Sequence, residues 1–271
     1  SGKLITWIVA ASLVAWLIKY LYVPAFEQLA LPGIAFEALL QPWSFVTYGF
    51  LHSGIFHLLF NMLVLNIVGR GILNVLGSKP FLGMFFMGVI AGGIGFSIAT
   101  LIAPAFFNAG YMVGASAGVY ALLFFLCFYL PETQVRLIIW NVKLIYIAYV
   151  LLGIAVFSIF GRINPGGNVA HVMGAGLGYF GAIKMHNGID ITSGFQRVIE
   201  FFKNLFSGKT IRKKSPLKTV YKNKERKLSS RVMQKSSQQE QIDAVLDKIS
   251  QSGYESLSAT EKEVLFKAGK E

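Results

Sequence analysis

The chain has 271 residues, of which 54% are hydrophobic and only 14% are charged. An average soluble domain carries about a quarter charged residues, so this composition excludes an ordinary water-soluble protein and indicates a membrane protein. The formal net charge of +12 comes almost entirely from residues 203–235, where twelve Lys and Arg residues accompany a single Glu.

Six apolar segments are candidates to cross a membrane. A span needs roughly 20 apolar residues to cross about 30 Å of hydrocarbon, and fewer where the bilayer thins. The candidates are residues 4–23, 55–76, 81–102, 116–130, 144–160 and 169–186. The fourth segment is short, because a helix of that length spans only about 22 Å. One of its ends must therefore stop below the membrane surface, which places Ser116 in a depression that water can reach.

The distribution of Lys and Arg predicts how the chain is oriented. These residues gather on the side that holds both termini, which makes both termini cytoplasmic. The apolar loop 24–54 then lies on the outer side, in the membrane interface. The basic residues 203–235 are interpreted as a tether to anionic lipid. A nucleic-acid site is less favoured, because no aromatic residues are interleaved to stack on bases.

The pattern of the last 35 or so residues predicts that they form a small helical module. Apolar residues recur at helical spacing over residues 238–249, and Ser258 to Glu261 fit a capping box at the start of a second helix. So short a module has little core of its own, and its docking partner stays open. The predicted organisation is a membrane domain (1–190), a basic cytosolic linker (191–236) and a two-helix cytosolic module (237–271).

Ser116 lies between Gly114 and Gly118, at the start of the fourth apolar segment. The pattern resembles a nucleophile elbow, but that motif needs a strand before the serine, and none is predicted here. One alternative is a helix-packing face of two glycines with the serine as a bystander. The other is a nucleophile at a helix N-terminus, where backbone N–H groups stabilise an oxyanion.

His171 shares a helix face with Gly174 and Gly178. Glycines allow close helix approach in lipid, and the glycines at 114–118 are the expected counterpart. Such an approach would bring His171 towards Ser116, with Tyr120 against the imidazole. The alternative is a histidine that only bonds a loop.

His57 and Asn61 also share a helix face. They are either polar contacts between helices or two donors of an oxyanion hole. The six apolar cores contain no Asp or Glu, so the sequence allows a Ser-His dyad and not a triad. The single cysteine, Cys127, forms no internal disulfide and no metal site alone. Neither a metal nor an organic cofactor is predicted.

Together, these motifs resemble the rhomboid intramembrane serine proteases over residues 4–186. The resemblance implies that Ser116 is the nucleophile and His171 the base, and that His57 and Asn61 join the Ser116 backbone in the oxyanion hole. It further implies that Tyr120 supports His171 and that His52 is a structural histidine near the active-site water. One departure is that Trp43 is followed by Ser44, where the family commonly has a Trp-Arg pair.

The implied fold is an all-α, six-transmembrane-helix rhomboid bundle with a small helical cytosolic tail. The implied activity is cleavage of a peptide bond in or beside a transmembrane segment of another membrane protein. The tail resembles an extension of some bacterial rhomboids, which implies a bacterial inner membrane. Two alternatives remain. The first is an inactive rhomboid-like protein that binds clients, and the second is a transporter, for which no inverted repeat is visible.

Overall fold

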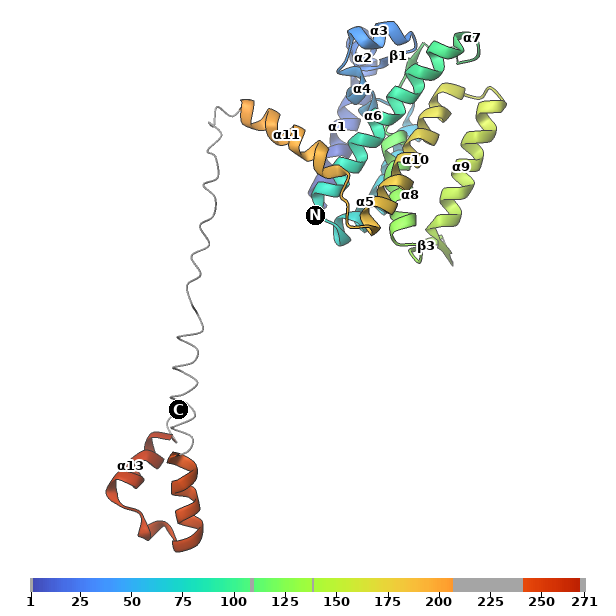
Figure 1. The fold of residues 1–271 in the computed structure, drawn as a ribbon. Coiled ribbons are helices and arrows are strands. Elements are labelled where there is room, and N and C mark those ends of the chain that lie inside the picture. Colours follow the sequence, from blue (N-terminus) through green and yellow to red (C-terminus); the bar gives the residue numbers. More distant parts are fainter. Residues whose placement is uncertain (1, 108–109, 138, 207–240, 269–271) are drawn as a thin grey trace. The chain divides into compact units, whose positions relative to one another are not determined.

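The computed structural model describes residues 2–107, 110–137, 139–206 and 241–268. The chain divides into two compact units, residues 1–209 and residues 210–271 (Figure 1). Each unit is described by itself below.

The first unit is a bundle of long helices that matches the six predicted spans to within four residues at each end. These helices are α1 (Lys3–Leu21), α5 (Ile55–Val75), α6 (Ser78–Ile102), α8 (Ser116–Tyr129), α9 (Leu144–Phe160) and α10 (Pro165–His186). Of the described helices, α1, α5 and α6 are long and apolar enough to cross a membrane, while α8 and α9 are apolar but shorter. The prediction of an all-α membrane bundle is confirmed.

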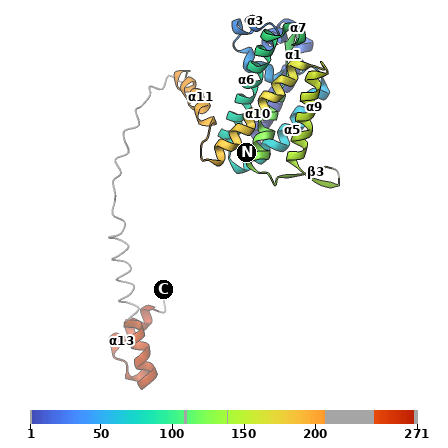
Figure 2. The same cartoon turned by 45° about the vertical axis from the view of Figure 1, so that its right-hand side comes forward.

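Helix α8 occupies the centre of this bundle. Ten of its residues are buried, and it contacts α5, α6, α9 and α10. A helix that is apolar on all sides belongs in a core, which is why this short helix is surrounded. Both views show α10 between α6 and α9 (Figures 1 and 2). The first residue of α8, Ser116, is therefore held by several neighbouring elements.

Close packing of α10 on α8 depends on two glycines. A Cβ atom at Gly174 would collide with the carbonyl oxygen of Ala117, and one at Gly178 with that of Ala121. The predicted close approach of these helices is confirmed, but the predicted counterpart is wrong. Gly118 faces α6 instead, where a Cβ would lie 2.8 Å from the carbonyl oxygen of Phe85, and Gly114 precedes the helix.

Short elements connect the helices at the end of the bundle where α8 begins. They are α2 (Val23–Leu29), β1 (Leu31–Pro32), α3 (Ala35–Leu40), α4 (Ser44–Thr47), η1 (Tyr48–Phe50), α7 (Pro104–Phe107) and β2 (Tyr111–Met112). Strands β1 and β2 pair antiparallel, with Leu31 opposite Met112. The indole N–H of Trp43 donates to the carbonyl oxygen of Gln28 at 2.8 Å. The long loop is thus anchored although Trp43 has no following Arg.

Two features mark the opposite end of the bundle. Strands β3 (Gln134–Leu137) and β4 (Trp140–Lys143) form an antiparallel hairpin between α8 and α9. Helix α11 (Thr192–Phe206) follows α10 and contacts α6. This helix was not predicted, because the basic residues that follow it dominated the interpretation of the segment as a linker. Most of the basic segment, from residue 207 on, lies outside the described residues.

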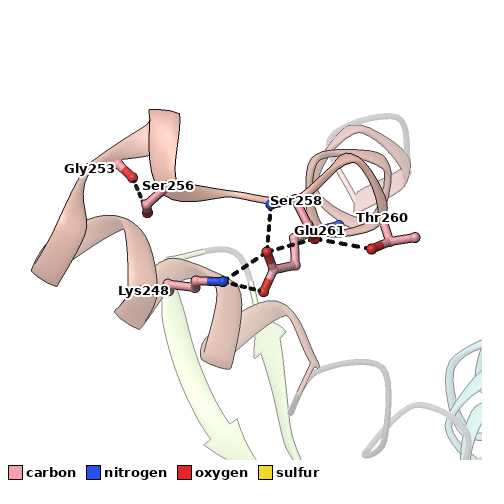
Figure 3. Close-up of polar contacts among 6 residues, drawn as sticks. All are labelled: Lys248, Gly253, Ser256, Ser258, Thr260 and Glu261. Atoms are coloured by element: carbon pink, nitrogen blue, oxygen red, sulfur yellow. Dashed lines mark hydrogen bonds and ion pairs between the residues drawn. The ribbon is translucent and has the colours of Figure 1, made fainter.

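The second unit contains the predicted helical module. Residues 241–252 are helical, followed by η2 (Tyr254–Ser256) and α13 (Ala259–Ala268). The capping box is confirmed: the backbone N–H of Ser258 donates to the Glu261 carboxylate at 2.7 Å, and that of Glu261 donates to Oγ of Ser258 at 3.4 Å (Figure 3). Lys248 adds an ion pair to the same carboxylate at 2.9 Å. One glutamate thus both caps α13 and ties it to the preceding helix.

Candidate active site

Ser116 and His171 are in direct contact, although they are 55 residues apart in sequence. Ser116 is the first residue of α8, and His171 lies in the second turn of α10. Nε2 of His171 is 2.7 Å from Oγ of Ser116. This separation lies within the range over which a base activates a hydroxyl nucleophile. The glycine contacts of α10 described above bring these two helix ends together.

Tyr120 fixes the plane of the His171 ring. The two rings stack with centroids 4.5 Å apart and an angle of 10° between their planes. The hydroxyl of Tyr120 donates to the carbonyl oxygen of Leu151 in α9 at 3.2 Å. Among the described residues, Nδ1 of His171 has no hydrogen-bond partner. The described part of the chain therefore supplies a pair, Ser116 and His171, without a third member that hydrogen-bonds to the imidazole.

The backbone before Ser116 requires glycine. Gly114 has φ +136°, a backbone conformation that residues other than glycine rarely adopt. Its N–H donates to the carbonyl oxygen of Tyr48 at 3.0 Å. A Cβ at this position would also lie 3.0 Å from Nε2 of His57 and 3.6 Å from Oγ of Ser116. Gly114 is thus the point at which His57 comes near the serine.

Residues of the loop that precedes α5 hold the His57 side chain in place. Nδ1 of His57 lies 3.0 Å from Oγ of Ser53, and its ring meets the ring of His52 edge-on at 5.0 Å. His52 is fully buried, with Nδ1 3.2 Å from the carbonyl oxygen of Phe50. Burial, followed by the proximity of His57, lowers the pKa of His52 to about 4. His52 therefore acts as a neutral packing group in this loop at physiological pH.

Asn61 lies one turn further along α5 and is buried, with 4% of its surface exposed. Its Nδ2 donates to the carbonyl oxygen of His57 at 2.9 Å. One amide hydrogen is thus used within the helix. An amide nitrogen carries two hydrogens, so this bond occupies only part of the donor capacity of Asn61.

Two cavities meet at the Ser116 and His171 side chains. A cavity of about 520 Å³ is lined by residues of the connecting loops and of the helix ends, among them Tyr48, Ser53, His57, Tyr111, Asn164 and His171. A smaller cavity of about 120 Å³ is mainly apolar and is lined by Phe60, Asn61, Val64, Leu123 and Leu151 with Ser116 and His171. The serine therefore stands between a roomy compartment with polar groups and a narrow apolar one.

The N-terminus of α8 adds electrostatic character to this position. The first N–H groups of a helix have no partner within the helix, and the aligned peptide dipoles make this end positive. Here the N–H of Val119 donates to the carbonyl oxygen of Ala115 at 3.0 Å. The N–H groups before it, including that of Ser116, belong to the unpaired first turn and can stabilise negative charge beside Oγ.

Three contributors to the site were missed in the sequence. Ser53 stands four residues before His57, and this spacing could have indicated a contact. Tyr48 donates from its hydroxyl to the carbonyl oxygen of Val89 at 2.6 Å, and no local pattern signals such a long-range bond. The backbone of Ala117 packs against Gly174. The sequence does not reveal this contact, because any small residue at position 117 would have looked equally compatible with it.

Comparison with known proteins decides the family. A family model described as the rhomboid domain matches residues 39–188, which is more than half of the chain. The chain belongs to the rhomboid family. The matched part of this rhomboid contains every predicted site residue, from His52 and His57 to Gly178. A second model, a family of unknown function (DUF6576), matches residues 232–269, which include the described part of the second unit.

Similar sequences are also rhomboid-related. The rhomboid is 37% identical to "Rhomboid-related protein 3" of Homo sapiens over 31% of this chain and 19% of that protein. It is 28% identical to "Rhomboid-related protein 1" of Caenorhabditis elegans over 55% of this chain and 42% of that protein. The chain thus spans less than half the length of these relatives. Both are animal proteins, so they lend no support to the expected bacterial membrane.

Proposed function

We propose that this rhomboid is an intramembrane serine endopeptidase that uses Ser116 and His171 as a catalytic dyad. The observation that carries the proposal is the 2.7 Å contact between Nε2 of His171 and Oγ of Ser116 at the N-terminus of a buried helix. A serine that was only a helix-packing bystander would need no imidazole at this distance. The substrate class is transmembrane segments of other membrane proteins, and no cofactor takes part.

The first half of the reaction forms an acyl-enzyme. Oγ of Ser116 attacks the carbonyl carbon of the scissile peptide bond while Nε2 of His171 takes its proton. The resulting tetrahedral intermediate carries its negative charge on the former carbonyl oxygen. As this intermediate collapses, the C–N bond breaks and His171 returns the proton to the departing amine. The acyl group stays on Ser116 as an ester.

In this proposal, three groups stabilise the oxyanion. They are the backbone N–H of Ser116, the imidazole of His57 and the second amide hydrogen of Asn61. When Ser53 donates its hydroxyl hydrogen to Nδ1 of His57, Nε2 carries the ring hydrogen and faces Gly114. Removing one oxyanion donor costs about 3 kcal/mol of transition-state stabilisation in a well-studied hydrolase.

The second half of the reaction needs water. The larger cavity joins Ser116 to the loop end of the bundle, which gives water a route to the ester. His171 takes a proton from that water, hydroxide adds to the acyl carbon, and the ester bond to Ser116 breaks with return of the proton to Oγ. The smaller, apolar cavity suits a hydrophobic side chain of the substrate.

The orientation follows the positive-inside rule. We place both termini in the cytoplasm and the opening of the site on the outer side, because Lys and Arg concentrate beside the opposite ends of the helices. A bacterial inner membrane is the setting implied by the resemblance of the tail to bacterial extensions.

A serine-reactive probe tests the proposal directly. The purified protein is incubated with a fluorophosphonate, the labelled residue is mapped, and cleavage of a model transmembrane substrate is measured in parallel. Labelling at Ser116, lost in Ser116→Ala together with cleavage, is expected. The variant His171→Ala should also lose both, since the hydroxyl would no longer be activated. Binding of substrate without labelling or cleavage would instead support the inactive, client-binding alternative.

A further inference from the structure

Helix α11 carries an apolar face that the first unit leaves mostly uncovered. Phe195, Val198, Ile199 and Phe202 follow the i, i+3, i+4, i+7 spacing of one helix face. Polar residues, including Arg197, Glu200 and Asn204, occupy the other side. Val198, Ile199 and Phe202 are 52%, 44% and 50% exposed, although each is a large hydrophobic residue.

The start of α11 is fixed to the bundle. Thr192 is fully buried, and a Cβ at Gly83 of α6 would lie 2.5 Å from the Thr192 Cβ. The Asp190 carboxylate accepts hydrogen bonds from the N–H and the hydroxyl of Thr192 at 2.8 and 2.6 Å. Phe195 stacks on Phe86 at 6.0 Å. The first turn is therefore anchored, and Figures 1 and 2 show the rest of α11 running outward from α6.

The position of α11 determines what can cover its apolar face. Five residues separate the end of α10 from the start of α11, which lies at the end of the bundle away from Ser116. At no more than about 3.6 Å per residue, this connection keeps the start of α11 close to the membrane face. An exposed apolar stripe at this level borders lipid.

The charges on and after α11 also indicate lipid as the partner of the apolar face. Glu200 is the only acidic residue of α11, and its carboxylate lies 3.8 Å from the ammonium group of Lys79 in α6. The stretch that follows, residues 203–235, carries a net charge of +11. An amphipathic helix continued by Lys and Arg is the pattern of segments that lie in a membrane interface rich in anionic lipid.

We propose that α11 is an interfacial helix, with Val198, Ile199 and Phe202 inserted among the lipids of the leaflet opposite the opening of the site. Its polar side faces the headgroups and the water. The basic residues that follow add attraction to anionic headgroups. This proposal depends on membership of a membrane family and on the contacts of α11, and it holds whether or not the chain is an active protease.

Fluorescent labels on the two sides of α11 test the proposal. The full chain carrying Phe202→Cys, or Ile199→Cys on the same face, is labelled with an environment-sensitive fluorophore and reconstituted into phosphatidylcholine vesicles containing phosphatidylglycerol. Arg197→Cys is the matched control on the polar side. Cys127 is buried, and the chain without an added cysteine measures any background labelling.

Lipids with a doxyl group near the headgroup should quench the labels at 199 and 202, while aqueous iodide should not. The label at 197 should show the reverse behaviour. Quenching of all three labels by iodide alone would place α11 in water and overturn the proposal. Protection of 199 and 202 from both quenchers would show that protein, either a second copy or the C-terminal module, covers the face, and would also overturn it.

The anionic component is tested separately with the same labels. Replacing phosphatidylglycerol by phosphatidylcholine, or raising the salt concentration, should reduce the doxyl quenching at 202, because attraction between Lys or Arg and anionic lipid is screened by salt. Identical quenching in both lipid mixtures and at all salt concentrations would refute a role for the basic segment.

Discussion

Oγ of Ser53 lies 3.0 Å from Nδ1 of His57, so a serine in the loop before α5 engages one ring nitrogen of a histidine in α5. With Nδ1 bonded to the serine hydroxyl, Nε2 is the nitrogen available to an oxyanion beside Ser116. Ser53 is therefore a positioning residue in the proposed mechanism, acting through His57.

The variant Ser53→Ala should lower kcat and leave KM nearly unchanged. One hydrogen bond is worth about 1 kcal/mol, which corresponds to a rate loss of about fivefold. Ser53→Thr retains the hydroxyl and should restore most of the rate. Steady-state kinetics on a model transmembrane substrate measure both parameters. An equal loss in the Ala and Thr variants would mean that this position matters for packing only.

The buried amide of Asn61 provides a second test of the oxyanion site. Asn61→Ala should lower kcat about ten- to a thousandfold and spare substrate binding, since donors aimed at developing charge act mainly in the transition state. His57→Ala should behave alike. A rise in the apparent binding constant alone would instead assign either residue to substrate contact.

The stacked ring of Tyr120 should matter more than its hydroxyl. Tyr120→Phe keeps the ring on His171 and loses only the bond to the carbonyl oxygen of Leu151, so its rate should stay close to that of the wild type. Tyr120→Ala removes a contact worth about 1 kcal/mol and frees the imidazole, and it should lower kcat by about fivefold or more. Equal losses in the two variants would assign the role to the hydroxyl.

Glycines of α10 offer a matched pair for testing helix packing. Gly178 faces the α8 backbone, whereas a Cβ at Gly176 meets nothing within 4 Å. Gly178→Leu should lower the thermal stability in detergent, because overpacking a tight contact costs about 1–3 kcal/mol, and should reduce activity by moving His171. Gly176→Leu should leave both nearly unchanged. Similar melting temperatures for the two variants would contradict the contact.

Much of the fold was predictable because apolar length and polar interruptions are local properties. The six spans emerged from hydropathy alone, and the Ser258 capping box from four residues. The helix against which a glycine packs, by contrast, is not a local property of the sequence. Gly118 packs on Phe85 of α6, and nothing near Gly118 in the sequence distinguishes α6 from α10 as its neighbour.

The site shows the same division between local and long-range information. Ser116 and His171 stood out because polar side chains are costly in a membrane and usually mark function. The bond from Tyr48 to Val89 and the approach of His57 to Gly114 depend on how distant segments meet. Helix α11 was missed for another reason: its apolar stripe is short, and the charge of the following residues suggested a basic linker.

The C-terminal module should weaken in acid through Glu261. Hydrogen bonds from Lys248 and from the Ser258 backbone and hydroxyl lower the pKa of Glu261 to about 2, from an ordinary value of 4.5. Between these values the unfolded module binds more protons than the folded one, so stability rises with pH there. The contribution of the carboxylate is therefore fully present above about pH 4.5 and is lost as the pH falls towards about 2.

Hydrogen exchange of α13 in the full chain, corrected for the intrinsic pH dependence of exchange, measures this effect. Glu261→Gln should reduce protection of α13 at neutral pH, and its difference from the wild type should shrink as the pH falls towards 2. Glu255→Gln is the control, because Glu255 is exposed and lies 4.0 Å from Lys262, and such surface pairs contribute little. Equal protection in the Glu261→Gln variant and the wild type at neutral pH would show that the capping box does not hold α13 in place.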